Sequence, residues 1–393
     1  MERLDAVVMG GGNLGKTLAA DMALAGLRVG LYEVREMAPR TLGGVLKDGK
    51  LSMSGCQANP KGFRRSGIAQ LELVTTDPKE AVEATKILLI AVPATHQERF
   101  FSEIIPHLRD GTVVSIHPDN FGSLVLRRMM REMGCDAEVV VGGWHSAPYG
   151  TRTGEDGELL CDVRESRQVF DALPSSDADA FEMAVGKLPI FDGASSLERA
   201  DTVVGVGLEN PNPAVHVPGS ILNVGAMEVS ETEGLFGIPR GRWSMYAHGM
   251  SPSVARVQLA FYMEELSIMR ALGIRPTVVH PQEQFSSRLS IMAPEYRIPF
   301  GICLLHPENW RISGPTSVEH RYFTEDIPIG CVARLELARA LGVKTPVIES
   351  LVRIGSALCS KDFESEGRTL SKMGLAGMER EEMLSYLRGG LRP

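Results

Sequence analysis

The sequence is poor in the patterns that mark secreted, metal-binding, nucleic-acid-binding and membrane proteins. Its six cysteines are scattered and form no C-x-x-C pair, which fits reduced thiols and neither a disulfide framework nor a zinc site. No block rich in lysine and arginine occurs, and a formal net charge of −8 argues against nucleic-acid binding. No apolar run reaches the roughly 18–20 residues that span a bilayer. With no room for a signal peptide, we expect a cytoplasmic protein.

Length and composition indicate a globular protein of two domains. A chain of 393 residues is too long for one ordinary core. Hydrophobic residues make up 44% of the chain and charged residues 23%, which are the proportions of ordinary globular proteins. We find no internal repeat and no low-complexity linker.

The most informative pattern lies close to the N-terminus. A G-x-G-x-x-G spacing follows a short apolar run directly and precedes the helix formers of Lys16–Leu24. The first glycine permits a tight strand-to-helix turn, the second lets the backbone approach a pyrophosphate, and the third lets helix and strand pack closely. The pyrophosphate is expected on the helix N-terminus. The predicted cofactor-binding residues of this segment are Gly10, Gly12, Asn13, Leu14 and Gly15.

The next predicted strand, Leu27–Tyr32, ends in an acidic residue. Glu33 lies about 20 residues after the fingerprint, where a carboxylate can accept hydrogen bonds from the adenosine ribose. It favours NAD(H), because it would repel the extra 2′-phosphate of NADP(H). Arg35 can accommodate that phosphate, so NADP(H) stays an alternative.

The first half of the chain alternates predicted strands and helices. Asp77 and Pro78 start one helix, as its cap and its first-turn residue. Ile87–Val92 is a continuous apolar run, as expected of a parallel strand buried on both faces. Further strands are predicted at Leu71–Val74, Thr112–Ile116 and Glu138–Val141, and irregular structure at Gly43–Gly67. The alternation predicts an α/β fold with a Rossmann-type doubly wound parallel sheet.

Beyond about residue 190 the strand signals almost vanish. Long amphipathic helices are predicted at Ser253–Leu272, Cys331–Leu341 and Pro346–Leu358. We therefore expect a dinucleotide-binding domain over residues 1–192 and a mostly α-helical substrate and catalytic domain over residues 193–393. The active site is expected in the cleft between them.

Three loops follow predicted strands at the edge where open α/β sheets bind ligands. The first begins with Val92 and Pro93 and is expected over the nicotinamide half of the cofactor; its His96 is either a cleft residue or a surface histidine. The other two loops are His117–Asn120 and Ala147–Arg152. Their expected substrate-binding residues are Asn120, Tyr149, Thr151 and Arg152.

Two segments of the helical half carry acid–base residues. His216 lies within Glu209–Pro218, and Asp326 lies within Glu319–Pro328. A histidine oriented by a carboxylate is the usual means of removing a proton near neutral pH. On the residues alone two other interpretations stay open. His216 can be a buried helix-start histidine bonded to the backbone, and the acidic residues after Thr324 can cap a helix.

On these segments the chain resembles the opine dehydrogenases of the octopine/nopaline dehydrogenase type. The resemblance covers nearly the whole chain, and its last two motifs are the specific ones, since many dehydrogenases share the first. The motifs are Gly10-x-Gly12-Asn13-x-Gly15, Ala91-Val92-Pro93-Ala94, Ala147-Pro148-Tyr149-x-x-Arg152, Asn210-Pro211-Asn212-Pro213-x-x-His216-x-Pro218 and Arg321-Tyr322-x-Thr324-Glu325-Asp326-Ile327-Pro328-x-Gly330.

The resemblance implies an oxidoreductase that joins an amino acid to a 2-oxo acid, by resemblance pyruvate, and reduces the imine with hydride from a nicotinamide. His216 and Asp326 match the family's histidine–aspartate pair, and Arg321 matches its arginine, a carboxylate clamp. Some relatives carry cysteine where this chain has Thr151, which leaves the amino-acid pocket open. The chemistry requires no metal.

Two rival functions share the early motifs. One is a two-domain NAD(P)-dependent dehydrogenase of 2- or 3-hydroxy acids, which would reduce a keto acid without an amine. The other is a nucleotide-binding regulator without turnover, which the set of His216, Asp326 and Arg321 disfavours. Small-molecule substrates are the expected partners. The helical half offers surface for a homodimer, but the sequence carries no interface signature.

Overall fold

The computed structural model describes residues 3–54, 65–154, 156–164, 167–192, 196–233, 237–278 and 314–390. The chain divides into two compact units. Unit 1 comprises residues 1–207 and 382–393, and unit 2 comprises residues 208–381. Within the described ranges, no helix combines the length and the apolar character needed to cross a membrane.

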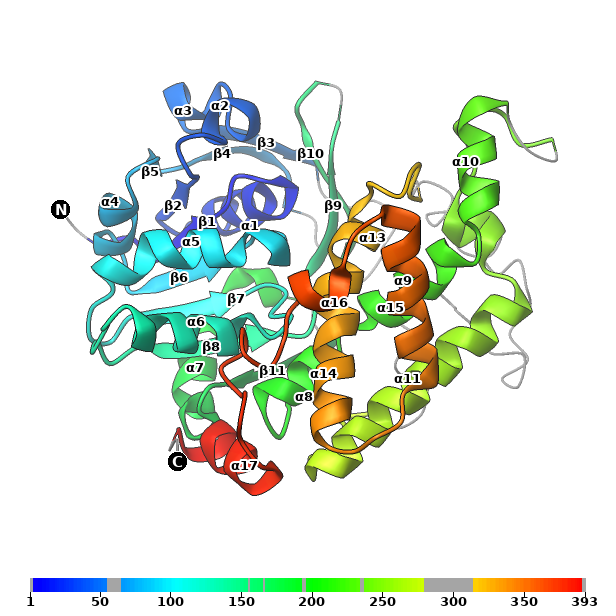
Figure 1. Ribbon diagram of the computed structural model, residues 1–393. Coiled ribbons are helices and arrows are strands. Elements are labelled where there is room, and N and C mark those ends of the chain that lie inside the picture. Colours follow the sequence, from blue (N-terminus) through cyan, green and yellow to red (C-terminus); the bar gives the residue numbers. More distant parts are fainter. Residues whose placement is uncertain are drawn as a thin grey trace. The chain divides into compact units, whose positions relative to one another are not determined.

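Unit 1 is built on an eight-stranded sheet (Figure 1), and its order is β12-β11-β8-β7-β6-β1-β2-β5. All neighbouring strands are parallel except β8 and β11, which are antiparallel. This arrangement confirms the predicted doubly wound sheet. The strands are β1 (Ala6–Met9), β2 (Val29–Tyr32), β5 (Leu73–Thr75), β6 (Ile87–Ile90), β7 (Val113–Ile116), β8 (Val140–Trp144), β11 (Arg167–Ala172) and β12 (Ser196–Arg199).

Helices cover both faces of this sheet. Because side chains alternate along a strand, Val8 of β1 joins a core with residues of α1 and α7, whereas Val7 joins a core with residues of α4, α5 and α6. Both faces are therefore buried, which explains the continuous apolar runs of the strands. The helices are α1 (Asn13–Leu24), α2 (Ala38–Thr41), α3 (Val45–Asp48), α4 (Pro78–Glu83), α5 (Gln97–Ile104), α6 (Gly122–Glu132), α7 (Ala178–Val185) and α8 (Val203–Leu208).

A second sheet in unit 1 was not predicted. Its order is β4-β3-β10-β9, from β4 (Gly67–Gln70), β3 (Lys50–Ser54), β10 (Leu159–Arg164) and β9 (Tyr149–Thr153). The expectation of irregular structure over Gly43–Gly67 is therefore wrong for its described part, while residues 55–64 lie outside the described residues. Leu51 and Met53 are buried and their neighbours are not, and this alternation is the signal that could have revealed β3.

Unit 2 is helical, as predicted. Figure 1 shows α9, α11, α14 and α15 side by side; α9, α11 and α15 contact one another, and α14 contacts α11 and α15. The predicted long helices are α11, α14 and α15; α14 begins one residue late because a π-helical turn, Asp326–Cys331, precedes it. The helices are α9 (Pro211–Ile221), α10 (Val224–Thr232), α11 (Pro252–Leu272), α13 (Arg321–Thr324), α14 (Val332–Ala340), α15 (Pro346–Cys359) and α16 (Phe363–Glu366), with another π-helical turn at Met245–Gly249.

The end of the chain returns to unit 1. The last helix, α17 (Arg380–Gly389), carries Leu387, whose side chain is fully buried. Ser175, which follows β11, donates a hydrogen bond to the Leu387 carbonyl at 3.3 Å. Unit 1 is therefore assembled from two separate stretches of the chain.

Candidate active site

The glycine fingerprint has the geometry that its spacing predicts. Gly10 has a φ of +116°, and a Cβ there would lie 2.8 Å from the Ala91 carbonyl oxygen. A Cβ on Gly15 would lie 1.8 Å from the Gly10 carbonyl oxygen, so helix α1 packs on the turn at a distance that only glycine permits. A Cβ on Gly12, in contrast, would meet no atom within 4 Å. The space beside Gly12 is thus open for a pyrophosphate.

The N-terminus of α1 is suited to the same ligand. Gly12 is its N-cap residue, and no side chain caps the helix there. The side chain of Asn13 lies to the side, where its Oδ1 accepts a hydrogen bond from Thr153 Oγ1 at 2.7 Å. Leu14, the next residue of this turn, is half-buried. The first turn therefore presents backbone N–H groups at the positive end of the helix, and the residues present fit a dinucleotide.

Glu33 lies beside the fingerprint and is only 2% exposed. Its Oε2 accepts hydrogen bonds from the Gly11 N–H and Thr41 Oγ1, each at 3.0 Å, and its Oε1 accepts from the Val34 N–H at 2.9 Å. This carboxylate is therefore held next to the glycine turn. The side chain of Arg35, by contrast, is exposed.

The loop after β6 lies against Gly10, the first glycine of the fingerprint. Val92 is buried, and its Cγ1 would lie 2.5 Å from a Cβ on Gly10. Pro93 is exposed and precedes a single 3₁₀ turn. His96 is exposed too, and its Nδ1 lies 3.1 Å from Thr95 Oγ1. Val92 therefore adjoins the fingerprint, while His96 has the exposure expected of a surface histidine.

The loop after β7 is buried in unit 1. The side chain of His117 is fully buried; its Nε2 lies 2.9 Å from Ser115 Oγ, and burial lowers its pKa to about 3. Asp119 accepts a hydrogen bond from the Ser123 N–H at 2.8 Å. Asn120 is also buried and has a φ of +47°, a conformation that non-glycine residues rarely adopt. His117 therefore stays neutral at physiological pH and is unsuited to act as a base.

The segment after β8 forms strand β9 in place of the expected loop, and it packs against α1. The hydroxyl of Tyr149 donates to Asp21 Oδ2, and Thr151 Oγ1 lies 2.7 Å from Thr17 Oγ1. Both side chains are buried in these contacts. Arg152 points elsewhere: it is exposed, and its Nη1 donates to the Thr151 carbonyl at 2.9 Å. Substrate binding by these residues stays a prediction.

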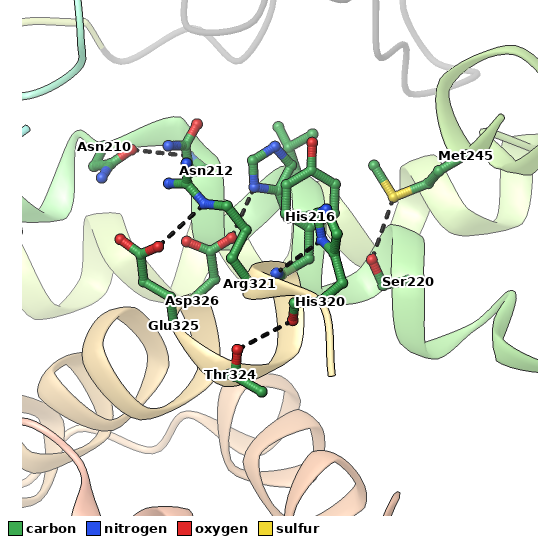
Figure 2. A network of polar contacts seen from close by, with 12 residues as sticks. Asn210, Asn212, His216, Ser220, Met245, His320, Arg321, Thr324, Glu325 and Asp326 are labelled. Atoms are coloured by element: carbon green, nitrogen blue, oxygen red, sulfur yellow. Dashed lines mark hydrogen bonds and ion pairs between the residues drawn. The ribbon is translucent and has the colours of Figure 1, made fainter. Parts of the chain in front are cut away.

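The histidine and the aspartate predicted in the helical half lie in contact with each other. Asn210 caps α9 by accepting a hydrogen bond from the Asn212 N–H at 3.0 Å, and this helix carries His216. His216 Nδ1 lies 2.8 Å from Asp326 Oδ2, although the two residues are 110 positions apart (Figure 2). The residues are 8% and 3% exposed, respectively. The interpretation of His216 as a helix-start histidine bonded to the backbone is therefore wrong.

Two tyrosines complete the surroundings of His216. Tyr246 OH lies 2.8 Å from His216 Nε2 and 2.6 Å from Tyr322 OH. The Tyr322 ring stacks on the imidazole, with centroids 3.6 Å apart and ring planes 14° apart. Sequence reasoning missed both roles. Tyr322 belongs to the motif that begins with Arg321, but no function was predicted for it. Tyr246 lies in a π-helical turn that no periodic pattern indicates.

Arg321 and Glu325 lie next to this pair. The two acidic neighbours Glu325 and Asp326 point their carboxylates to different partners, Glu325 towards Arg321 and Asp326 towards His216 (Figure 2). Arg321 Nε lies 3.1 Å from Glu325 Oε2, and the Glu325 carboxylate raises the pKa of the guanidinium. The Arg321 side chain is nevertheless 51% exposed. The ion pair uses Nε, and among the residues that the structure describes no ion pair to the two Nη atoms occurs, so these atoms can serve a carboxylate.

A buried arginine joins the segments that carry the pair. Arg334 of α14 is fully buried, and its Nη2 donates to the carbonyls of Leu208 and Asn210 at 3.2 Å, just before α9. Its Nη1 donates to the Gly330 carbonyl at 3.0 Å, in the π-helical turn that begins with Asp326. Glu265 of α11 balances the charge, with Oε1 2.5 Å from Nε. Arg334 therefore fixes the spacing between the backbone segments of His216 and Asp326.

Comparisons with known proteins show what the chain as a whole is similar to. Residues 199–359 match the family described as NAD/NADP octopine/nopaline dehydrogenase, alpha-helical domain. The chain is 28% identical to an opine dehydrogenase of Arthrobacter sp. (strain 1C) over 379 residues, which cover 94% of this chain and 95% of that protein.

Solved structures show the same fold over nearly the whole chain. An octopine dehydrogenase with NADH and pyruvate has a TM-score of 0.68 at 17% identity and covers 94% of this chain and 95% of its own. Yersinopine dehydrogenase bound to NADP⁺ has a TM-score of 0.66 at 14% identity and covers 98% of both chains. The predicted fold and the predicted resemblance are thereby confirmed.

Proposed function

We propose that this chain is an opine dehydrogenase, which catalyses the NAD(P)H-dependent reductive condensation of an amino acid with a 2-oxo acid. The observation that carries the proposal is the buried hydrogen bond of 2.8 Å between His216 Nδ1 and Asp326 Oδ2. It supplies the positioned base that the amine chemistry requires, since an ammonium group must lose a proton before its nitrogen can attack a keto carbon.

The pair performs this task by its geometry. Because a carboxylate only accepts hydrogen bonds, Asp326 holds the proton of His216 on Nδ1 and leaves Nε2 with the basic lone pair. When the imidazole takes up a proton, Asp326 stabilises the resulting charge inside a site that is screened from water. The same imidazolium can return the proton when the carbinolamine loses water. His216 thus acts as base and then as acid.

Arg321 is the proposed clamp for a substrate carboxylate. A half-exposed guanidinium whose Nη atoms make no ion pair with the described residues offers two parallel N–H donors to a planar anion. Glu325 fixes its orientation through Nε. We take pyruvate as the 2-oxo acid because the octopine dehydrogenase that shares this fold was solved with NADH and pyruvate.

The fingerprint of unit 1 is the proposed cofactor site. Gly12 and the uncapped N-terminus of α1 would hold the pyrophosphate, and the nicotinamide supplies the hydride when it is bound. We propose NAD(H) as the preferred form, since the buried carboxylate of Glu33 lies beside the turn and would repel a 2′-phosphate. The exposed Arg35 supports the alternative, NADP(H).

The decisive test is an absorbance assay of NADH and NADPH oxidation, with pyruvate and a panel of amino acids against pyruvate alone. We expect oxidation that depends on the amine and is faster with NADH. Oxidation by a keto acid alone would move the chain to the hydroxy-acid dehydrogenases. Measurable NADH binding without any turnover would support a non-catalytic role.

A further inference from the structure

We propose that Tyr322 is a positioning residue for the base, because its ring holds the His216 imidazole by one face and stabilises the imidazolium that forms there. This inference rests on the proposed function and adds to it a residue that acts through His216. The observation that carries it is the stack of the two rings, whose centroids are 3.6 Å apart and whose planes are 14° apart.

The two hydrogen bonds of the imidazole do not restrain it in every direction. Nδ1 of His216 lies 2.8 Å from Asp326 Oδ2, and Nε2 lies 2.8 Å from the Tyr246 hydroxyl. Hydrogen bonds to an imidazole run in the plane of its ring, so they resist sliding within that plane but not rocking about the line through the two nitrogens. The Tyr322 ring lies against the face that would move. The stack therefore supplies a restraint that the hydrogen bonds lack.

The geometry of the stack favours a charged imidazole. Two neutral aromatic rings prefer offset or edge-to-face contacts, with centroids about 4.5–7 Å apart. Tyr322 makes such a contact with His320, where the centroids are 4.5 Å apart and the planes 82° apart. Its contact with His216 is closer and nearly parallel, so the electron-rich face of the phenol ring lies directly on the imidazole. This arrangement attracts an imidazolium more strongly than a neutral imidazole.

Tyr322 is itself held in this position. Its N–H donates to Nδ1 of His320, the cap of α13, at 3.3 Å, and its hydroxyl lies 2.6 Å from that of Tyr246. The residue is only 7% exposed. A ring that is fixed at its backbone and its hydroxyl does not have to reorient when the histidine takes up a proton. The stabilisation is therefore in place before the proton moves.

The other ionisable groups near the imidazole come from the elements packed around α9. Asp326 and Tyr246 bond to its two nitrogens. Arg321 interacts electrostatically with Asp326, and His320 lies edge-on against the stacked ring. From α11, the neutral Gln258 donates to a backbone carbonyl of α9. The carboxylate and the stacked ring favour the imidazolium, so loss of the ring should shift the balance towards the neutral imidazole.

The first experiment compares Tyr322→Leu, Tyr322→Phe and Phe323→Leu in the NADH assay with pyruvate and the active amino acid, over a range of pH. Phe323 is the matched control, because its fully buried ring belongs to the same short helix. Tyr322→Leu should lower kcat about tenfold and move the acid limb of kcat/KM about one pH unit lower, since the imidazolium loses the ring. Tyr322→Phe keeps the ring, and Phe323→Leu leaves the stack intact, so both should retain the wild-type acid limb.

A second experiment separates electrostatics from packing. Phenylalanines with one, two and three ring fluorines, incorporated at position 322, keep the shape of the ring and withdraw increasing electron density from its face. We expect the pH midpoint of the His216 titration to fall with each added fluorine. The titration is followed by NMR of isotope-labelled histidine and assigned with His216→Ala. The same series at position 323 should leave the midpoint unchanged, and the series also replaces Tyr322→Leu if that protein fails to fold.

The outcomes distinguish the role of the ring from the proposed function. A wild-type protein without amine-dependent oxidation refutes the function, while the NMR titration still tests the ring because it needs no turnover. A midpoint that stays constant across the fluorinated series at position 322 refutes the role of Tyr322, whether or not the protein is active. A graded fall of the midpoint together with a graded fall of kcat supports both.

Discussion

Each unit contains a polar network with an aspartate and a tyrosine, and the two networks differ in construction. In unit 1, residues spaced by two along β9 meet residues spaced by four along α1, in the pairs Thr153–Asn13, Thr151–Thr17 and Tyr149–Asp21. In unit 2, the chain Asp326–His216–Tyr246–Tyr322 joins three separate segments. The first network repeats the periods of its strand and helix, whereas the second does not.

The difference indicates which of the two networks takes part in catalysis. The network of unit 1 consists of hydroxyl, amide and carboxylate groups that each complete a contact between two elements of secondary structure. The network of unit 2 contains an imidazole with a partner on each nitrogen, the one side chain whose ordinary pKa lies near neutral pH. We therefore interpret the first network as scaffold and the second as catalytic machinery, and four sets of substitutions test that contrast.

The largest effect is expected from His216→Ala. Loss of the base should lower kcat by about 10⁴-fold, which corresponds to about 5 kcal/mol in the activation free energy. The Kd for NADH, measured by fluorescence titration, should stay unchanged because the fingerprint belongs to unit 1. Loss of NADH binding would contradict the role given to His216.

The second substitution tests whether the catalytic network depends on Arg334, which holds the backbone segments of the histidine and the aspartate. Arg334→Met removes the donors to Leu208, Asn210 and Gly330 and leaves Glu265 as an uncompensated buried charge. The free energy of unfolding should fall by about 4 kcal/mol in urea titrations.

The double substitution Arg334→Met with Glu265→Leu is the control. It should recover much of the stability, since the buried charge is gone, but kcat should stay low because the two backbone segments are no longer joined. Full recovery of kcat in the double variant would show that Arg334 serves stability alone.

The third set, two glycine substitutions, examines the backbone of unit 1. Gly15→Ala places a Cβ 1.8 Å from the Gly10 carbonyl oxygen and should lower the free energy of unfolding by about 3 kcal/mol. Gly12→Ala meets no protein atom within 4 Å, so stability should be unchanged while the Kd for NADH rises. Equal stability losses in both variants would argue against an open pyrophosphate site at Gly12.

The smallest effect is expected in the scaffold network. Thr17→Val removes one hydroxyl that contacts Thr151 Oγ1 at 2.7 Å and donates to the Asn13 carbonyl at 2.8 Å. Thermal unfolding should show a loss of about 1 kcal/mol, and kcat should match that of the wild type. A large loss of kcat would move this network from scaffold to active site.

The fingerprint could be predicted from the sequence because its demands are local. Gly10 has a φ of +116°, and Gly15 lies against the carbonyl of Gly10, five residues before it, so the spacing of the glycines reflects requirements of one turn. The strands of the large sheet were equally accessible, since burial on both faces leaves uninterrupted apolar runs. The second sheet was missed because β3 lies in a stretch whose glycines and polar residues masked its short alternation.

Only part of the catalytic network could be predicted from the sequence. Chemistry alone left His216 and Asp326 open to other interpretations, and the resemblance to a family decided between them. Tyr246 carried no signal, because its contact with His216 is made by tertiary packing between residues 30 positions apart. The π-helical turn that begins with Asp326 also escaped prediction, since a widened turn has no period of its own in the sequence.

The return of α17 to unit 1 has a consequence for folding during translation. A nascent chain emerges from the ribosome N-terminus first, and domains generally fold as they appear. The large sheet of this protein is synthesised early, yet the stretch with Leu387, which Ser175 contacts, is synthesised only after unit 2. Translation of unit 1 therefore begins before that of unit 2, but unit 1 can be completed only after all of unit 2 has been synthesised.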